Sequence, residues 1–268
     1  MNLLIFGATG GTGRALVEQA LQQGHTVTAF ARNPSKVRAT HPNLRVAKGD
    51  IASYESVESA LRGQDAALSA LGVGVRAWPL VTVVVITQVI RRLFHLIGPI
   101  GWLVRLGIPL LAYFILFRRT STLSEGTKTI VRAMEKAGVK RFVCESSLGI
   151  GDSKGQLGLL FNYLMIPLFL RNIFADKEVQ EQVIKQSNLD WVIVRPGRLT
   201  NGPRTGNYKS GFSTSDTSIQ AKISRADVAD FLVKQIDDDA FLHKTPVLTS
   251  SLPTSRSEPT RPPRRRAV

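Results

Sequence analysis

Three glycines near the start of the chain constrain its fold more than any other feature. Gly7, Gly10 and Gly13 follow a short apolar run, Leu3–Phe6, of the kind found in strands that are buried on both faces. The apolar residues after them recur with a helical period, and we expect Gly24 to close that helix as its C-cap. A strand, a glycine turn and a helix in this order indicate a dinucleotide-binding βα unit.

The spacing of the three glycines gives each of them a physical role. Gly7 permits a tight turn, Gly10 lets a pyrophosphate approach the backbone without meeting a Cβ atom, and Gly13 lets the helix pack on the strand. The helix N-terminus then offers free N–H groups and the positive end of a dipole to the phosphates. A glycine-rich turn in another α/β protein could have the same spacing, so the flanking strand and helix carry the prediction.

Strands and helices alternate along the chain, which predicts an α/β protein with a doubly wound parallel sheet, the Rossmann fold. Further strands are expected at Thr26–Ala31, Leu44–Ala47, Asp65–Leu71, Arg141–Ser146, Trp191–Arg195 and Pro246–Thr249. Further helices are expected at Ser53–Leu61, Leu123–Ala137, Asp176–Gln186 and Arg225–Ile236. A capping box, Thr122-Leu123-Ser124-Glu125, is expected to open the helix at Leu123, and the composition of Asn201–Asp216 predicts a loop.

The residue after the second strand predicts the type of cofactor. An NAD-binding unit is expected to have an acidic residue there, which accepts a hydrogen bond from the ribose 2′-hydroxyl. This chain has Arg32 instead, and a guanidinium suits a 2′-phosphate through bidentate, charge-assisted hydrogen bonds. The alternative is a solvated surface arginine. We therefore expect NADP(H), with Lys36 and Arg38 as further cations nearby.

The alternation stops at Val73–Arg119, a segment that is apolar, basic and free of acidic residues. It contains two apolar runs, Ala77–Ile90 and Leu93–Phe117, and Arg105 near the middle of the second run would cost about 3 kcal/mol in a bilayer. Three interpretations stay open. The segment is a membrane-associated hairpin or re-entrant segment through residues 77–117, an apolar subdomain or dimer surface that caps the active site, or a stretch of no native fold, such as translated non-coding sequence.

The net charge of +15 would normally suggest a nucleic acid or an anionic membrane as a partner. Much of this charge lies in the insert at 73–119 and in residues 250–268, which are rich in Ser, Thr, Pro and Arg. No nucleic-acid motif accompanies the charge, so nucleic-acid binding is not expected. The sequence predicts one NAD(P)-binding domain at residues 1–249, interrupted by the insert, and a disordered basic tail at 250–268.

Cysteine and histidine usage bears on the compartment and on metal binding. The single cysteine, Cys144, excludes an internal disulfide and a cysteine-based zinc site, and the histidines are scattered, so no metal site is expected. Cys144 lies within an expected strand and should be buried and inert. No signal-peptide pattern is present, which favours a reducing, cytoplasmic compartment. Membrane association through the insert stays open.

Taken together, the motifs resemble those of the atypical short-chain dehydrogenase/reductases. Within that superfamily they are most similar to the NAD(P)H-binding group that includes flavin reductase/biliverdin reductase B and NmrA-like proteins. The motifs that carry the resemblance are the glycine turn, Arg32, Gly49-Asp50, Ser146-Ser147, Arg195-Pro196-Gly197 and Ser224-Arg225-Ala226-Asp227-Val228-Ala229. The likeness covers residues 1–72 and about 121–248, and the insert and the tail depart from it.

The resemblance implies where an NAD(P)H cofactor would lie. It assigns the pyrophosphate to Gly7, Thr9, Gly10, Thr12 and Gly13, and the 2′-phosphate to Arg32. Asp50 and Ile51 would flank the adenine, and Ala70, Leu71 and Gly72 would line the nicotinamide ribose. Pro196 and Gly197 would lie behind the nicotinamide ring.

The family's active site commonly has a serine at the end of the fifth strand and a tyrosine four residues before a lysine. Ser147, or its neighbour Ser146, matches the serine and Lys177 matches the lysine, but Ile173 stands where the tyrosine would be. That tyrosine is the usual proton relay, so its absence disfavours the oxidation of a plain alcohol. Lys177 could also be only a ribose ligand or a helix-surface lysine, and Ser147 only a strand-end serine.

The sequence therefore predicts an NAD(P)H-binding oxidoreductase that prefers NADPH and reduces a small or lipid-like acceptor. A flavin, a quinone or a conjugated carbonyl fits, because such an acceptor needs no enzyme tyrosine. Two other functions stay open, a non-catalytic NADP(H)-binding redox sensor and a membrane-linked assembly factor. The sequence does not determine the oligomeric state.

Overall fold

The structure of the chain is a computed structural model, which describes residues 1–72, 121–156, 163, 166, 170–211, 219–220 and 222–251. The strands are β1 (Asn2–Phe6), β2 (Thr26–Ala31), β3 (Leu44–Lys48), β4 (Ala66–Ser69), β5 (Arg141–Glu145), β6 (Asp190–Pro196), β7 (Arg198–Thr200), β8 (Tyr208–Ser210), β9 (Ile219–Gln220), β10 (Lys222–Ser224) and β11 (Val247–Ser251). The helices are α1 (Gly11–Gln22), α2 (Tyr54–Leu61), α5 (Thr122–Ala137), α6 (Arg171–Lys185) and α7 (Arg225–Lys234), with short 3₁₀ turns η1 (Pro34–Lys36) and η3 (Gly151–Ser153).

The main sheet has the strand order β3-β2-β1-β4-β5-β6-β11-β8, and β9 pairs with β11. Neighbouring strands are parallel from β3 to β11, whereas β8 and β9 run antiparallel to β11. The strand order reverses between β1 and β4, and ligands bind at such a switch point, outside the carboxyl ends of the strands. The predicted doubly wound α/β fold is confirmed.

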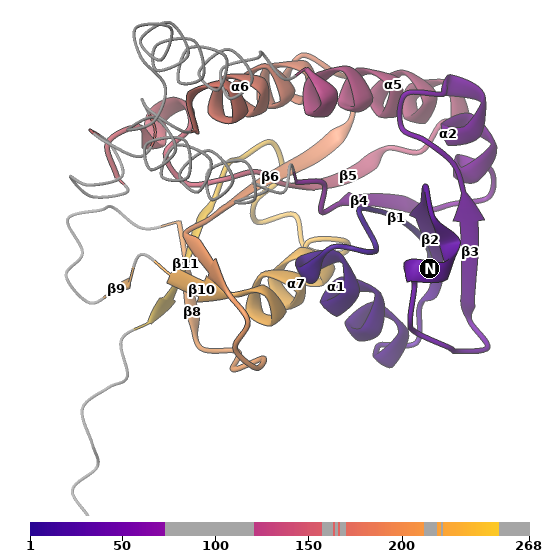
Figure 1. Ribbon diagram of the computed structural model, residues 1–268, viewed down its shortest axis with the longest axis horizontal. Coiled ribbons are helices and arrows are strands. Elements are labelled where there is room, and N and C mark those ends of the chain that lie inside the picture. The colour runs from indigo at the N-terminus through magenta and orange to yellow at the C-terminus, as the bar shows by residue number, and fades with distance from the viewer. Residues whose placement is uncertain are drawn as a thin grey trace, which may run out of the picture.

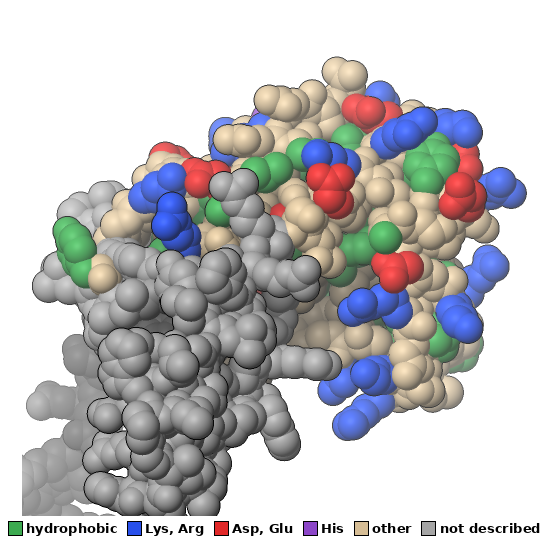
Figure 2. All heavy atoms as spheres, turned by 45° about the horizontal axis from the view of Figure 1, so that its top comes forward, with side chains coloured by type: hydrophobic (Ala, Val, Ile, Leu, Met, Phe, Trp, Pro, Cys, Tyr) green, Lys and Arg blue, Asp and Glu red, His purple; other side chains and the backbone are tan. Residues whose placement is uncertain are grey.

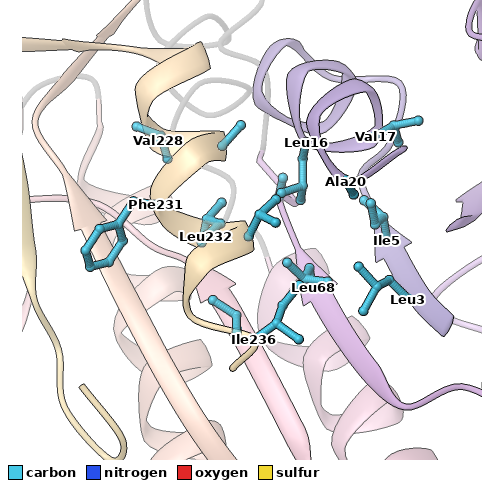
Figure 3. Packing of buried hydrophobic residues seen from close by; sticks show 14 of the residues in the cluster. Leu3, Ile5, Leu16, Val17, Ala20, Leu68, Val228, Phe231, Leu232 and Ile236 are labelled. Carbon is cyan, nitrogen blue, oxygen red and sulfur yellow. The ribbon is translucent and has the colours of Figure 1, made fainter. Parts of the chain in front are cut away.

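Helices cover both faces of this sheet (Figure 1). The helices α2, α5 and α6 lie on one face, and α1 and α7 lie on the other. Because successive residues of a strand point to opposite faces, Leu3 and Ile5 of β1 pack under α1 and α7 (Figure 3), while Leu4 and Phe6 pack under α2 and α5. β1 is thus buried on both faces, as its apolar run predicts.

Most element boundaries differ from the sequence predictions by one or two residues, and two differences have a clear cause. Gln23, not Gly24, is the C-cap of α1, and Gly24 follows it at φ +83°, a left-handed conformation that favours glycine. Helix α6 begins at Arg171 rather than at Asp176, because its first turn uses residues of the apolar stretch that precedes the polar pattern.

The prediction of a loop over Asn201–Asp216 is wrong in part. Residues Tyr208–Ser210 form β8, which pairs antiparallel with β11. This short strand carries no readable alternation, and its partner lies about forty residues further along the chain, so local pattern reasoning misses it.

The insert at 73–119 lies outside the described residues, and so does the tail from residue 252 onward. The predicted tail begins too early, because Ser250 and Ser251 belong to β11. The structure describes the flanks of the insert, which are Gly72 after β4 and Ser121 before α5. Among the residues that the structure describes, no helix is both long and apolar enough to cross a bilayer.

Candidate functional site

A cleft of about 340 Å³ opens at the carboxyl ends of β1, β2 and β4, at the switch point of the sheet. It is lined by residues from the glycine turn, from the loops after β2, β3 and β4, and from the start of α5. The lining residues that the sequence assigned to a cofactor are Gly7, Thr9, Gly10, Arg32, Asp50, Ile51, Ala70, Leu71 and Gly72. The fold therefore brings residues from four separate loops to one cleft.

The glycines of the turn have two different roles, since two are required by close backbone contacts and one leaves the start of α1 without a side-chain cap. Gly7 has φ +77° and a Cβ atom there would lie 2.5 Å from the carbonyl oxygen of Ala70, while a Cβ atom on Gly13 would lie 2.1 Å from the carbonyl oxygen of Gly7. These two glycines are thus required by the packing of the turn itself. Gly10 lines the cleft as the N-cap of α1 and provides no side-chain cap, so no capping side chain competes with an anion for the first N–H groups of the helix.

Arg32 is a cation that the fold places on the lining of the cleft. It is exposed, follows β2 directly, and lines the cleft together with Asp50 and Ile51. Lys36 and Arg38 are also exposed but do not line the cleft. Arg32 therefore stands where the sequence predicts a contact with a 2′-phosphate.

Four of the assigned residues, Thr12, Gly13, Pro196 and Gly197, do not line this cleft. Pro196 ends β6, and the Gly197 N–H donates to the carbonyl oxygen of Leu248 in β11 at 2.9 Å. Thr12 is buried in the first turn of α1, and its hydroxyl donates a hydrogen bond to an acidic residue.

That acidic residue is Glu145, which the sequence reasoning missed. The Thr12 hydroxyl donates to Oε1 of Glu145 at 3.1 Å, and both side chains are buried. Burial raises the pKa of the Glu145 carboxyl, while Lys177 and the Thr12 hydroxyl oppose that rise. A charged residue at the end of the otherwise apolar strand Phe142–Cys144 is the signal that could have identified it.

Lys177 belongs to α6 and its side chain reaches the end of β5, so the interpretation of it as a helix-surface lysine is wrong. Its side chain is buried, and Nζ donates to the backbone oxygen of Ser146 at 3.0 Å. Burial lowers the pKa of Lys177, and the nearby Glu145 opposes this. The hydroxyl of Ser146 is already engaged, donating to Oε1 of Glu181 at 2.6 Å, whereas Ser147 is half-buried beside it.

A buried ion pair supports this end of the sheet. Arg195 of β6 is 1% exposed and Glu181 of α6 is 3% exposed. Nε and Nη2 of Arg195 donate to the two carboxylate oxygens of Glu181 at 3.0 and 2.7 Å, and Arg195 also contacts Asp152. Burial raises the pKa of Glu181, but hydrogen bonds from Arg195 and Ser146 outweigh it and hold the pKa below its usual value.

The start of α5, at the rim of the cleft, is capped by α6 and not by a capping box. The N-cap residue Ser121 makes no side-chain cap. Instead, the carboxylate of Asp176 accepts from the N–H groups of Leu123 and Ser124, both at 3.0 Å. The predicted capping box at Thr122 is therefore wrong, because the helix already begins at Thr122 and the Glu125 N–H, which the box would direct to the Thr122 side chain, donates to the backbone oxygen of Ser121 instead.

We expect Asp176→Ala to lower the free energy of unfolding by about 1–2 kcal/mol, because the substitution leaves two buried N–H groups of α5 without an acceptor. Asp176→Asn should lose less, because its amide oxygen can still accept one of the two bonds. Chemical denaturation of the two variants beside the wild type measures the difference. Equal stability of Asp176→Ala and the wild type would show that this cap contributes nothing.

Other features of the described residues limit the chemistry of the site. In this part of the chain no group of His, Cys, Asp and Glu side chains is arranged to hold a metal ion. Burial raises the pKa of Cys144 to about 12, so its thiol is protonated at neutral pH. On the face shown in Figure 2, the Lys and Arg side chains are interspersed with Asp and Glu over the helices at the top of the molecule.

Comparison with known families and proteins bears on the cofactor. Residues 7–97 and 107–239 match a protein family that is described as NAD(P)H-binding. An uncharacterized chloroplastic protein of Arabidopsis thaliana is 30% identical over 238 residues, which are 87% of this chain and 71% of that protein. The photosystem II assembly factor Ycf39 of Synechocystis is 27% identical over 259 residues, 93% of this chain but only 63% of the assembly factor.

Solved structures share the fold at lower identity. The oxidoreductase ylbE from Lactococcus lactis has a TM-score of 0.67 at 21% identity, covering 94% of this chain and 92% of that one. ChuY, an anaerobillin reductase from Escherichia coli, has a TM-score of 0.64 at 22% identity, covering 96% and 99%. A short-chain dehydrogenase/reductase from Veillonella parvula in complex with NADP has a TM-score of 0.63 at 15% identity, covering 92% and 93%. At these identities the likeness shows the fold alone.

Proposed function

Because the chain belongs to the NAD(P)H-binding family, we propose that it is an oxidoreductase that prefers NADPH to NADH and reduces a small or hydrophobic acceptor. The observation that carries the cofactor preference is Arg32, an exposed guanidinium on the cleft at the position where an acidic residue would serve NAD. Binding of a 2′-phosphate by this residue would be charge-assisted.

The chain's own residues would bind the cofactor along the cleft. The open N-terminus of α1 at Gly10 would hold the diphosphate, Asp50 and Ile51 would flank the adenine, and the Ala70–Gly72 backbone would line the nicotinamide ribose. Bound NADPH supplies the hydride, and the protein supplies orientation and exclusion of water. We assign Ser147 and Lys177 to the reaction end, since Lys177 is held at the end of β5 beside Ser147.

The class of acceptor follows from the absence of a tyrosine four residues before Lys177. Ile173 of α6 stands four residues before Lys177, where a tyrosine would relay a proton. An acceptor such as a flavin, a quinone or a conjugated carbonyl fits this site, because its reduction does not need an enzyme tyrosine. Gly72 and Thr122, which flank the apolar insert in sequence, both line the cleft, which supports a hydrophobic acceptor at its rim.

We expect Arg32→Ala to weaken NADPH binding by about 10- to 100-fold and to leave NADH binding nearly unchanged, because one charge-assisted contact to the 2′-phosphate is lost. Calorimetric titration of both nucleotides measures the ratio. Arg38→Ala is the matched control, since Arg38 is an exposed arginine of the same segment that does not line the cleft. An unchanged ratio of the two affinities in Arg32→Ala would overturn the assignment.

The relation to a photosystem II assembly factor favours a second candidate function. In this alternative the chain binds NADP(H) without turnover and acts as a redox sensor or as an assembly factor, with residues 77–117 as the segment that meets a membrane. Steady consumption of NADPH with flavin or quinone acceptors supports the oxidoreductase. Tight binding of NADPH with no consumption across both acceptor classes supports the alternative.

A further inference from the structure

Gly11 stands in the glycine turn but belongs to none of the three fingerprint positions. A Cβ atom on Gly11 would lie 2.5 Å from Cδ and 2.8 Å from Nε of Arg225. The side chain of Arg225 therefore lies across Gly11, directly over the first residue of α1. No motif requires a glycine at this position, but the structure supplies a reason for one, because any larger residue would displace the arginine.

Arg225 is held in this place from two sides. It is the first residue of α7, and α1 and α7 pack side by side on the same face of the sheet (Figure 1). Gln19 of α1 donates through Nε2 to the backbone oxygen of Ala226 at 2.8 Å, which fixes the start of α7 against α1. Nη1 of Arg225 donates to Oδ1 of Asn201 at 2.6 Å.

The two neighbouring helix N-termini differ in a way that points to an anion. α7 is capped by its own Ser224, whose hydroxyl accepts from the Asp227 N–H at 2.9 Å, and Asp227 adds a carboxylate in the first turn. α1 has Gly10 as its N-cap, no side-chain cap and no acidic residue in its first turn. The N-terminus of α1, which has no side-chain cap, and the half-buried guanidinium of Arg225 thus lie together. The hydrogen bond from Arg225 goes to the uncharged amide of Asn201, and the charge of Arg225 also opposes the rise in pKa that burial causes at the Glu145 carboxyl.

We propose that Arg225 is a further cofactor-binding residue, which contacts the diphosphate of the dinucleotide from beside Gly11 at the start of α1, with Asn201 as its positioning residue. The proposal rests on the proposed function, since it assumes that the dinucleotide lies along the cleft. It differs from the role of Arg32, because the diphosphate is common to NADPH and NADH. Arg225 therefore contributes to affinity for both nucleotides and not to the choice between them.

The experiment compares ligands that differ in the diphosphate. Full-length protein is titrated with 2′-phospho-ADP-ribose, which carries the diphosphate, and with adenosine 2′-monophosphate, which does not. We expect Arg225→Met to weaken the binding of 2′-phospho-ADP-ribose by about 10- to 100-fold and to keep the affinity for adenosine 2′-monophosphate within about twofold of the wild type. The affinities for NADPH and NADH should fall by the same factor. Arg225→Lys, which keeps the charge without the planar fork, should fall between Met and the wild type.

Lys222→Met is the matched control, because Lys222 is an exposed cation in β10, three residues before Arg225. It should bind both probes as the wild type does. Gly11→Ala tests the contact itself, since its methyl group would displace the arginine. We expect Gly11→Ala to weaken the binding of 2′-phospho-ADP-ribose by the wild type, and to cause little further loss of affinity in Arg225→Met. Such non-additive effects would show that the two positions act through the same contact.

The outcomes separate this inference from the proposed function. Wild-type protein that binds neither NADPH nor 2′-phospho-ADP-ribose overturns the proposed function and this inference with it. If the wild type binds both and folded Arg225→Met binds 2′-phospho-ADP-ribose equally well, the role of Arg225 is refuted and the proposed function stands. Equal weakening of both probes would show that Arg225 acts on the structure of the site and not on the diphosphate, which also overturns the inference.

Discussion

Gly10→Val is expected to abolish detectable dinucleotide binding in a protein that still folds. A Cβ atom at this position would lie 3.3 Å from the carbonyl oxygen of Gly7, a tight contact that a small shift relieves. The rest of the valine side chain has only the cleft to occupy, because Gly10 lines it at the N-terminus of α1. We therefore expect at least about a hundredfold loss of NADPH affinity, which corresponds to about 2.7 kcal/mol.

Gly13→Ala is the contrasting variant in the same turn. Its Cβ atom would lie 2.1 Å from the carbonyl oxygen of Gly7 and 3.0 Å from Cα of Ala8, and these are backbone atoms that cannot swing away. We expect a loss of about 3 kcal/mol or more in the free energy of unfolding, because the turn and the helix must move apart. Thermal unfolding and NADPH titration of both variants separate the two roles. NADPH affinity retained in folded Gly10→Val would refute the fingerprint.

Arg195→Met is expected to lower the free energy of unfolding by about 3–5 kcal/mol, because it leaves the carboxylate of Glu181 buried without its bidentate partner. Glu181→Leu should lower the free energy of unfolding by a similar amount, because it leaves the buried guanidinium of Arg195 without its bidentate carboxylate partner. The double variant Arg195→Met/Glu181→Leu should recover most of the loss, because neither charge is then buried alone. Chemical denaturation of the two single variants and the double variant measures this coupling. A double variant as unstable as the sum of the single ones would contradict it.

The pH dependence of Arg195→Met should oppose that of the wild type. In the wild type the pKa of Glu181 is held below its usual value, so the pair stabilises the fold above about pH 4 and loses that effect as the pH falls through the folded-state pKa. Without Arg195, burial raises the folded-state pKa of Glu181, so its contribution is favourable at low pH and is lost as the pH rises. The deficit of Arg195→Met should therefore be largest at neutral pH and smaller near pH 4.

The sequence by itself determined the fold class and most of the cleft. Hydrophobic periodicity and the glycine turn are local signals, and they predicted the parallel strands β1 to β6 and the helices between them. The carboxyl ends of parallel strands meet at one edge of the sheet, so Gly10, Arg32, Asp50 and Gly72 could be expected in one cleft from their positions after strands.

Only the tertiary structure decided which polar groups meet at that edge. Helix α6 is rich in polar residues, and its sequence does not say which of them are buried. In the structure Asp176, Lys177 and Glu181 are buried against α5, β5 and β6 respectively. Each finds its partner more than ten residues away in sequence, and no local periodicity encodes such a pairing. The same holds for Arg225 on Gly11, where the contact exists because α1 and α7 pack on one face of the sheet. Sequence patterns set which elements form, and the packing of those elements against one another sets which charged groups share a site.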